Sequence, residues 1–232
     1  MNTFSAELID KKMVSPQTMF TRFQTEERLA FKPGQFIAVH VETEKRYYSL
    51  ASSPLLPNQF DLLSDISHGG IGGQYLQNLN IHATISFIGP FGNFILQNSK
   101  LPKLFLATGV GISPIRGMIQ TLALQQYQNH FILLWGVSYE KDLFFLNEWE
   151  KISAQNKNFS VHYVLSKENK TPNFHYGHIQ DAVIPLLQNL KIAPQDLEYY
   201  ICGRVSNVQT VTAYLQENLQ VSPARIFFEK FV

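Results

Sequence analysis

The stretch Leu104-Phe-Leu-Ala-Thr-Gly-Val-Gly-Ile-Ser-Pro-Ile-Arg116 joins an apolar run, a glycine turn and a helical pattern. Residues 104–107 are typical of a buried strand, and apolar residues recur at helical spacing from Ile115 onward. Glycines at 109 and 111 let backbone amides approach a phosphate, and Pro114 suits the first turn of a helix. The stretch predicts a nucleotide phosphate at Thr108, Gly109 and Gly111. An ordinary strand-to-helix turn explains the same letters, and the Gly-x-Gly-x-x-Gly fingerprint is absent.

Length and composition exclude several classes of protein. The chain has 232 residues, a formal net charge of +1 and a single cysteine. It is long enough for two small domains, and its charge argues against a nucleic-acid partner bound by bulk electrostatics. One cysteine excludes an intrachain disulfide and a cysteine-ligated iron–sulfur cluster within the chain. The sequence lacks a run long enough for a membrane span, so a reduced cytoplasmic setting is expected.

The chain divides into two parts with different patterns. Up to about residue 94 short apolar or alternating runs are separated by Pro and Gly, which indicates an antiparallel barrel or sandwich with one short helix at 73–79. The expected strands are 7–14, 19–25, 35–41, 46–50, 59–64 and 84–87. A polar link follows, so we predict a first domain at residues 1–98 and a second at 99–232.

In the second part strands alternate with helical patterns, which predicts an α/β domain with a parallel sheet covered on both faces. The expected strands are 103–108, 131–137, 161–165, 199–202 and 226–228. The expected helices are 115–124, 143–152, 179–190 and 208–219. Pro185 makes a single helix over 179–190 doubtful.

In the first part the run from Arg46 to Pro54, RYYSLASSP, carries the most chemistry. An arginine fork suits phosphate oxygens, and Tyr48 and Ser49 offer a flat face and a short donor. Together they suit a flat, phosphorylated ligand. The spacing alone favours the alternative, an edge strand with alternating exposure.

Six segments in order resemble those of the ferredoxin–NADP reductase superfamily. The flavin motif Arg-x-Tyr-Ser corresponds to 46–49, the second flavin segment to Gly70-Ile-Gly-Gly-Gln-Tyr-Leu76, and a barrel turn to Gly89-Pro-Phe-Gly92. The nicotinamide phosphate turn corresponds to 107–114, the Cys-Gly pair to 202–203, and the Glu-x-Phe ending to 229–231. The resemblance implies an FAD-binding β-barrel followed by an NAD(P)-binding α/β domain.

The resemblance also implies roles for individual residues. The residues expected to bind FAD are Arg46, Tyr48, Ser49, Leu50, Gly70, Gly72 and Gly73. The residues expected to bind NADPH or NADH are Thr108, Gly109, Gly111, Pro114, Ser166, Lys167, Cys202, Gly203 and Arg204. Tyr48, Ser49, Cys202 and Glu229 would lie at the catalytic centre. A plain buried cysteine and an exposed terminal carboxylate remain the alternatives for Cys202 and Glu229.

The chain departs from the family's pattern at several positions. Gly73 replaces a usual Ser or Thr, which removes one donor to the FAD phosphate. Arg204 and Asn207 stand in place of a usual Pro and Met. Family members that prefer NADPH often carry Arg where this chain has Ser138, and Ser-Arg where it has Ser166-Lys167. Lys167 is a weaker phosphate ligand than arginine, but an acidic residue that would repel a 2′-phosphate is not obvious at these positions, so we expect a slight preference for NADPH.

The sequence thus predicts a flavoprotein reductase that passes hydride from NAD(P)H to bound FAD. It would then pass single electrons to a separate carrier, ferredoxin or flavodoxin. A flavin reductase that uses free flavin as substrate, and a relay subunit without nicotinamide turnover, are the alternatives. The seven histidines show no metal-ligand spacing, so no metal site is expected.

Overall fold

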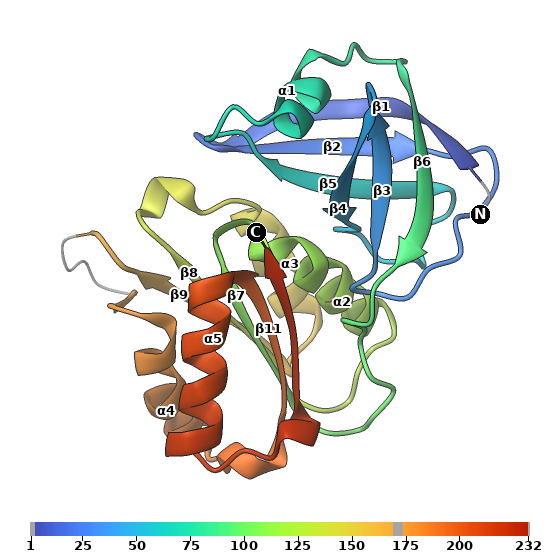
Figure 1. Cartoon of the computed structure of the whole chain (residues 1–232). Helices are drawn as coiled ribbons and strands as arrows, with labels where there is room; N and C mark the ends of the chain where they lie inside the picture. Colours follow the sequence, from blue (N-terminus) through green and yellow to red (C-terminus); the bar gives the residue numbers. More distant parts are fainter. Residues whose placement is uncertain (1–2, 169–173, 232) are drawn as a thin grey trace.

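The computed structural model describes residues 3–168 and 174–231, which form two sheets of different kinds (Figure 1). The first is a six-stranded antiparallel sheet of order β4-β3-β6-β1-β2-β5. Its strands are β1 (Thr3–Ser15), β2 (Thr18–Gln24), β3 (Phe36–Val41), β4 (Glu44–Ser49), β5 (Gln59–Asp65) and β6 (Thr84–Phe91). A bridge between Leu50 and Leu62 joins the two edges of this sheet and closes it into a barrel.

The second sheet is parallel, with the order β10-β9-β8-β7-β11-β12. Its strands are β7 (Lys103–Thr108), β8 (Phe131–Val137), β9 (Phe159–Leu165), β10 (His175–Tyr176), β11 (Glu198–Arg204) and β12 (Ile226–Phe231). The chain runs outward from β7 in one direction and returns to its other side with β11. The carboxyl ends of β7 and β11 therefore form a switch point, where open α/β sheets bind ligands.

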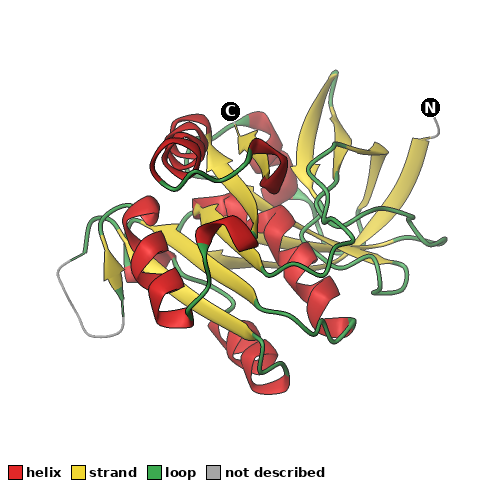
Figure 2. Cartoon of the chain, turned by 90° about the horizontal axis from the view of Figure 1, so that it is seen from below, coloured by secondary structure: helices red, strands yellow, loops and turns green. Residues whose placement is uncertain are grey.

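Helices cover both faces of the parallel sheet (Figure 2). The helices on the sheet are α2 (Ile112–Leu124), α3 (Leu146–Gln155), α4 (Ile179–Leu190) and α5 (Val205–Ala213). A further helix, α1 (Ile71–Asn78), lies on the barrel. Sheet residues alternate between two cores: Phe105 and Leu133 pack with α2 and α3, whereas Leu104 and Leu134 pack with α4 and α5. Both faces are buried, which explains why these strands read as continuous apolar runs.

The predicted fold class is therefore confirmed, and several element bounds are corrected. Helix α4 is continuous through Pro185, because Val183, Leu186 and Leu187 bury its apolar face and offset the lost hydrogen bond. The helix expected from 143 begins only at 146, because Phe145 adopts a left-handed conformation with φ 58°. Strand β6 extends to 91, past the expected end at 87.

Other bounds shift by a few residues, and one strand was not predicted. Helix α1 begins at 71 rather than 73, which places Gly72 and Gly73 in its first turn. Helix α5 begins at 205, and a π-helical turn (Tyr214–Asn218) follows it. The two-residue strand β10 carries too little pattern to be predicted. The boundary at 98/99 falls between β6 and β7 and stays a prediction. None of the helices in the described part of the chain is long and apolar enough to span a membrane.

Candidate functional site

The end of β4 meets the first turn of α1 in the barrel half. A Cβ atom at Gly72 would lie 2.5 Å from the Tyr48 hydroxyl and 3.0 Å from Cγ of Arg46. Only glycine lets the helix approach the strand so closely. The N-cap residue Gly70 makes no side-chain hydrogen bond to this turn, so its amides are not capped from within. The structure thus brings together two segments that the sequence places more than twenty residues apart.

The Tyr48 hydroxyl is buried and has no hydrogen-bond partner among the described residues. Burial raises the pKa of Tyr48 to about 12, so the hydroxyl stays protonated and can donate. A buried polar atom without a partner costs free energy comparable to a lost hydrogen bond. A polar ligand at this position would satisfy the hydroxyl.

The other residues of this motif differ in exposure. Arg46 lies at the barrel edge, where its side chain is 38% exposed and pairs with the Glu44 carboxylate. Leu50 is fully buried, and its amide donates to the Gln35 carbonyl. A side chain at Gly73 would press on the backbone of the β5–α1 loop, with Cβ only 3.3 Å from the Asp65 carbonyl. The guanidinium of Arg46 is thus within reach of a ligand, whereas the Leu50 side chain belongs to the core.

Ser49 connects the barrel to the last strand of the parallel sheet. Its hydroxyl donates to Oε2 of Glu229 at 3.2 Å, across 180 residues of sequence. Burial raises the pKa of Glu229 to about 7, although the Ser49 hydrogen bond acts to lower it. This carboxyl can therefore gain or lose a proton near neutral pH. Figure 1 shows the end of β12 lying between the two halves.

Cys202 pairs with Glu229 in the register of β11 and β12. Its side chain is 1% exposed. Burial raises the pKa of the Cys202 thiol well above its ordinary value, and the nearby Glu229 acts in the same direction. The thiol is therefore neutral, which suits contact with a flat ligand and excludes a role as a thiolate nucleophile.

The two glycines of the phosphate turn serve different purposes. Gly109 has a positive φ of 53°, and a Cβ atom there would face open space. A Cβ atom at Gly111 would lie 2.2 Å from the Cys202 carbonyl oxygen, so this glycine lets the turn pack on β11. A role at the phosphate stays a prediction for both glycines, and Gly111 carries this second constraint as well. Its absent side chain serves contact between backbones.

A cleft of about 480 Å³ opens at the carboxyl ends of the parallel strands. Among the predicted coenzyme-binding residues, its lining includes Thr108, Gly109, Gly111, Ser166, Gly203 and Arg204. Lys167, Pro114 and Cys202 do not line it. Pro114 lies inside α2 in the core, and Lys167 is exposed. The predicted phosphate turn at 108–111 therefore forms one wall of this cleft.

Asn207 and Phe231 line the cleft and His68 contacts the lining residue Arg204, although the sequence assigned a role to none of the three. Asn207 donates to the Thr108 hydroxyl at 3.3 Å, and Arg204 lies 3.4 Å from His68 of the barrel. Phe231 lines the cleft at the end of β12. Asn207 follows the recognised Cys-Gly pair, and Phe231 belongs to the Glu-x-Phe ending. The sequence could therefore have indicated that both lie near the coenzyme. His68 carried none, because its contact joins residues 136 positions apart.

Beyond β8, near the far end of the cleft, carboxylates accept hydrogen bonds from backbone amides. Asp142 lines the cleft and accepts from the Tyr139 amide at 3.1 Å. Glu168 accepts from the Glu140 amide at 2.8 Å. Two cations lie in the same region of the chain: Lys141, whose ammonium lies over the Tyr139 ring, and Lys167. Two backbone donors near this end, the Tyr139 and Glu140 amides, are thus already paired with the chain's own acids.

Two family models match the chain. An oxidoreductase FAD-binding domain matches residues 5–95, and an oxidoreductase NAD-binding domain matches residues 105–212. Together they cover most of the barrel and the parallel sheet from β7 to β11, whereas β12 with Glu229 lies beyond the matched residues. These matches and the relatives below show that FAD and NAD(P)H are the cofactors.

Known proteins are similar along nearly the whole chain. Ferredoxin–NADP reductase B of Sorangium cellulosum is 28% identical, over 98% of this chain and 97% of its own length. The electron transfer component of anthranilate 1,2-dioxygenase from Acinetobacter baylyi is 29% identical over 89% of this chain, which spans 60% of that protein. The crystal structure of the Amycolatopsis cytochrome P450 reductase GcoB superposes with a TM-score of 0.89 at 24% identity, covering 99% of this chain and 70% of that one.

Proposed function

Since this chain belongs to the ferredoxin–NADP reductase superfamily of FAD- and NAD(P)-binding oxidoreductases, we propose that it passes hydride from NAD(P)H to bound FAD and then single electrons to a separate carrier protein. The observation that carries the proposal is the hydrogen bond between Ser49 and Glu229. It brings the barrel's flavin motif and the end of the coenzyme cleft to one place.

The residues of the barrel fit FAD. The unpartnered Tyr48 hydroxyl and the uncapped first turn of α1 offer donors side by side. In the proposed site Arg46 and the amides at Gly70, Gly72 and Gly73 bind the pyrophosphate, because a helix N-terminus and a guanidinium both favour phosphate. Tyr48 packs against the ring system, and Ser49 donates to its edge.

When bound, FAD supplies the chemistry that accepts a hydride and releases electrons singly. The chain's own residues bind and orient the reactants. Thr108, Gly109 and Gly111 bind the NAD(P)H pyrophosphate at the switch point. Cys202 contacts the nicotinamide as a neutral thiol. Glu229, whose pKa of about 7 lets it hold a proton, orients the nicotinamide end. Arg204 binds the nucleotide from the N-cap of α5.

The contacts beyond β8 favour NADH over NADPH, contrary to the slight preference expected from Ser166 and Lys167. A 2′-phosphate at this end needs free donors and cations, and it is repelled by carboxylates. The Tyr139 and Glu140 amides already donate to Asp142 and Glu168. Lys167 does not line the cleft. We therefore propose NADH as the better substrate.

The carrier is proposed to be of the ferredoxin or flavodoxin type. The names of two similar proteins support this type of carrier. One is a ferredoxin–NADP reductase, and the other is the electron transfer component of a dioxygenase. A reductase that releases free flavin is the second candidate, because Gly73 offers no side-chain donor to the FAD phosphate. The proposed location is the cytoplasm.

Purification followed by flavin quantification and carrier reduction tests the proposal. We expect about one FAD per chain after gel filtration, and NADH-dependent reduction of ferredoxin or flavodoxin that exceeds reduction of added riboflavin. Colourless protein that turns over added riboflavin would transfer the proposal to a free-flavin reductase. Bound flavin that neither NADH nor NADPH can reduce would instead indicate a relay subunit.

A further inference from the structure

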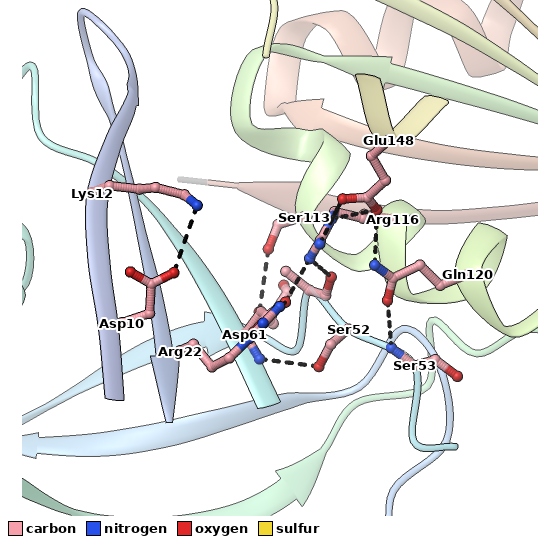
Figure 3. A network of polar contacts seen from close by, with 12 residues as sticks. Asp10, Lys12, Arg22, Ser52, Ser53, Asp61, Ser113, Arg116, Gln120 and Glu148 are labelled. Atoms are coloured by element: carbon pink, nitrogen blue, oxygen red, sulfur yellow. Dashed lines mark hydrogen bonds and ion pairs between the residues drawn. The ribbon is translucent and has the colours of Figure 1, made fainter. Parts of the chain in front are cut away.

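Helix α2, which follows the phosphate turn, contacts the barrel through a face rich in polar side chains, beside apolar contacts. This face consists of residues three and four apart, which share one side of a helix. They are Ser113, Arg116, Gly117, Gln120 and Thr121. Their partners lie in residues 49–53, directly after the flavin motif of β4, and in β5. Figure 3 shows this contact.

The face begins at the flavin motif itself. The Ser113 hydroxyl donates to the Ser49 carbonyl at 3.2 Å. One turn later, a Cβ atom at Gly117 would lie 2.7 Å from the Ser52 carbonyl, so the helix and this segment touch backbone to backbone. At the far end Thr121 donates to the Ser53 hydroxyl at 2.8 Å. The contact therefore follows the helix for more than two turns.

Arg116 lies at the centre of this face and is 3% exposed. Its Nη1 donates to the Ala51 carbonyl and to Oδ2 of Asp61, both at 2.8 Å. Its Nε and Nη2 donate to the Glu148 carboxylate of α3, with the Nη2 contact also at 2.8 Å. A planar guanidinium with donors in fixed directions holds three partners only in one arrangement. Sliding α2 on the barrel would break several charge-assisted bonds at once.

We propose that Arg116 is a positioning residue for hydride transfer, which holds the phosphate turn at a fixed place relative to the flavin motif. The inference rests on the proposed function. Arg116 lies five residues after Gly111, or about 7.5 Å along the helix axis. Hydride transfer requires the reacting atoms to be roughly 3–3.5 Å apart, and displacements of about 1 Å cost large factors in rate. We call the contacts of Arg116 with Ala51, Asp61 and Glu148 the Arg116 joint. Because this joint lies so close to the phosphate turn, it sets the distance between the reacting atoms.

Arg22 offers a matched control. It also forms a fork on Asp61, at 2.7 and 3.0 Å. Both Arg22 and Asp61 belong to the barrel, on β2 and β5, so this pair does not cross between the halves. Replacing either arginine leaves Asp61 with one remaining partner. Only the Arg116 replacement releases α2.

The experiment is anaerobic stopped-flow reduction of the flavin-loaded wild type, Arg116→Met and Arg22→Met by NADH. In Arg116→Met we expect the limiting reduction rate to fall roughly 10- to 100-fold. The dissociation constant for NADH should change by about threefold at most, because the turn itself is intact. Arg22→Met should reduce at the wild-type rate within about twofold, even if its stability falls.

Arg116→Lys serves if the methionine variant does not fold. It keeps the charge beside Asp61 but cannot reach three partners, so its limiting rate should fall while its flavin stays bound. Equal limiting rates in the wild type and in either folded Arg116 variant would overturn the inference. An equal loss of rate in Arg22→Met would overturn it too, because the effect would follow Asp61 rather than the joint. Failure of NADH and NADPH to reduce the wild-type flavin would instead refute the proposed function.

Discussion

Arg116 and Glu229 both join the barrel to the parallel-sheet half, but their contacts differ in strength and in chemistry. Arg116 is almost fully buried, and its guanidinium holds three partners in two elements besides its own helix and in the segment after β4. Glu229 makes one hydrogen bond to Ser49 at 3.2 Å, and its pKa of about 7 lies in the physiological range. The first contact lies behind the phosphate turn and the second beside Cys202.

The difference indicates that the two contacts have different roles, one fixed and one displaceable. A reductase must keep its two halves in register while admitting and releasing coenzyme between them. The Arg116 joint holds the register, because breaking it would leave buried charges without partners. The Glu229 contact is weak and titratable, so a nicotinamide ring can displace it at little cost. Four substitutions test this contrast through the free energy of unfolding, each measured by denaturant titration with FAD in excess.

Asp61→Ala should have the largest effect. The carboxylate is fully buried and pairs with both Arg22 and Arg116. Removing it leaves two guanidinium groups without their acidic partner, so we expect a loss of about 3–5 kcal/mol. Glu44→Ala removes the exposed partner of Arg46 and should cost less than about 1 kcal/mol. Similar losses in the two variants would show that the joint is no stronger than a surface ion pair.

Gly117→Ala should destabilise the protein, although alanine in a helix is ordinarily favoured by about 0.5–1 kcal/mol over glycine. The added Cβ would lie 2.7 Å from the Ser52 carbonyl and 3.1 Å from that of Leu50. Both carbonyls belong to the backbone after β4, which cannot move aside as a flexible side chain would. We therefore expect a loss of about 1–3 kcal/mol in the free energy of unfolding. A more stable variant would mean that α2 is free to move on the barrel.

Glu229→Gln should remove a pH dependence. Because the folded pKa of about 7 lies above the ordinary value of 4.5, the folded state binds more protons than the unfolded chain between these values. The wild type should therefore lose stability relative to the variant as the pH rises through this window, by about 1–2 kcal/mol. Unfolding curves of both proteins at pH 5 and pH 8 give the difference. If the difference in the free energy of unfolding between the two proteins is the same at pH 5 and pH 8, Glu229 does not titrate in this window.

Ser49→Ala should have the smallest effect on stability, about 0.5–1 kcal/mol, because it removes one partly solvated hydrogen bond. Since that bond lowers the pKa of Glu229, the midpoint of the pH dependence should also move to higher pH. A loss as large as that of Asp61→Ala would contradict the contrast between the two contacts.

Local patterns predicted the fold, and they also singled out the two segments that are proposed to face the cofactors. The run 104–116 contains its own strand, turn and helix signals, and Arg46 to Ser49 form a compact motif. The Arg116 joint could not be predicted, because its partners lie 32, 55 and 65 residues away. In the sequence Arg116 reads as an ordinary polar residue of a helix, and Asp61 as the outward residue of a strand. Only the closed barrel and the docked helix make them meet.

Pro185 and Gly111 show the same limit. A proline in a helical pattern predicts a break, yet tertiary contacts of the apolar face of α4 hold the helix together. Gly111 was predicted to let backbone approach a phosphate, and the carbonyl of Cys202 on a neighbouring strand places a second constraint on it. In both cases the deciding contact comes from another element, which local sequence does not encode.

Anaerobic single-turnover reduction of the wild-type protein tests the central claim most directly. The purified protein, carrying its FAD, is mixed with NADH or with NADPH, and the flavin absorbance is followed. We expect the bound flavin to be bleached in one fast phase, with NADH as the faster donor. Flavin that stays oxidised with both coenzymes would contradict hydride transfer across the cleft.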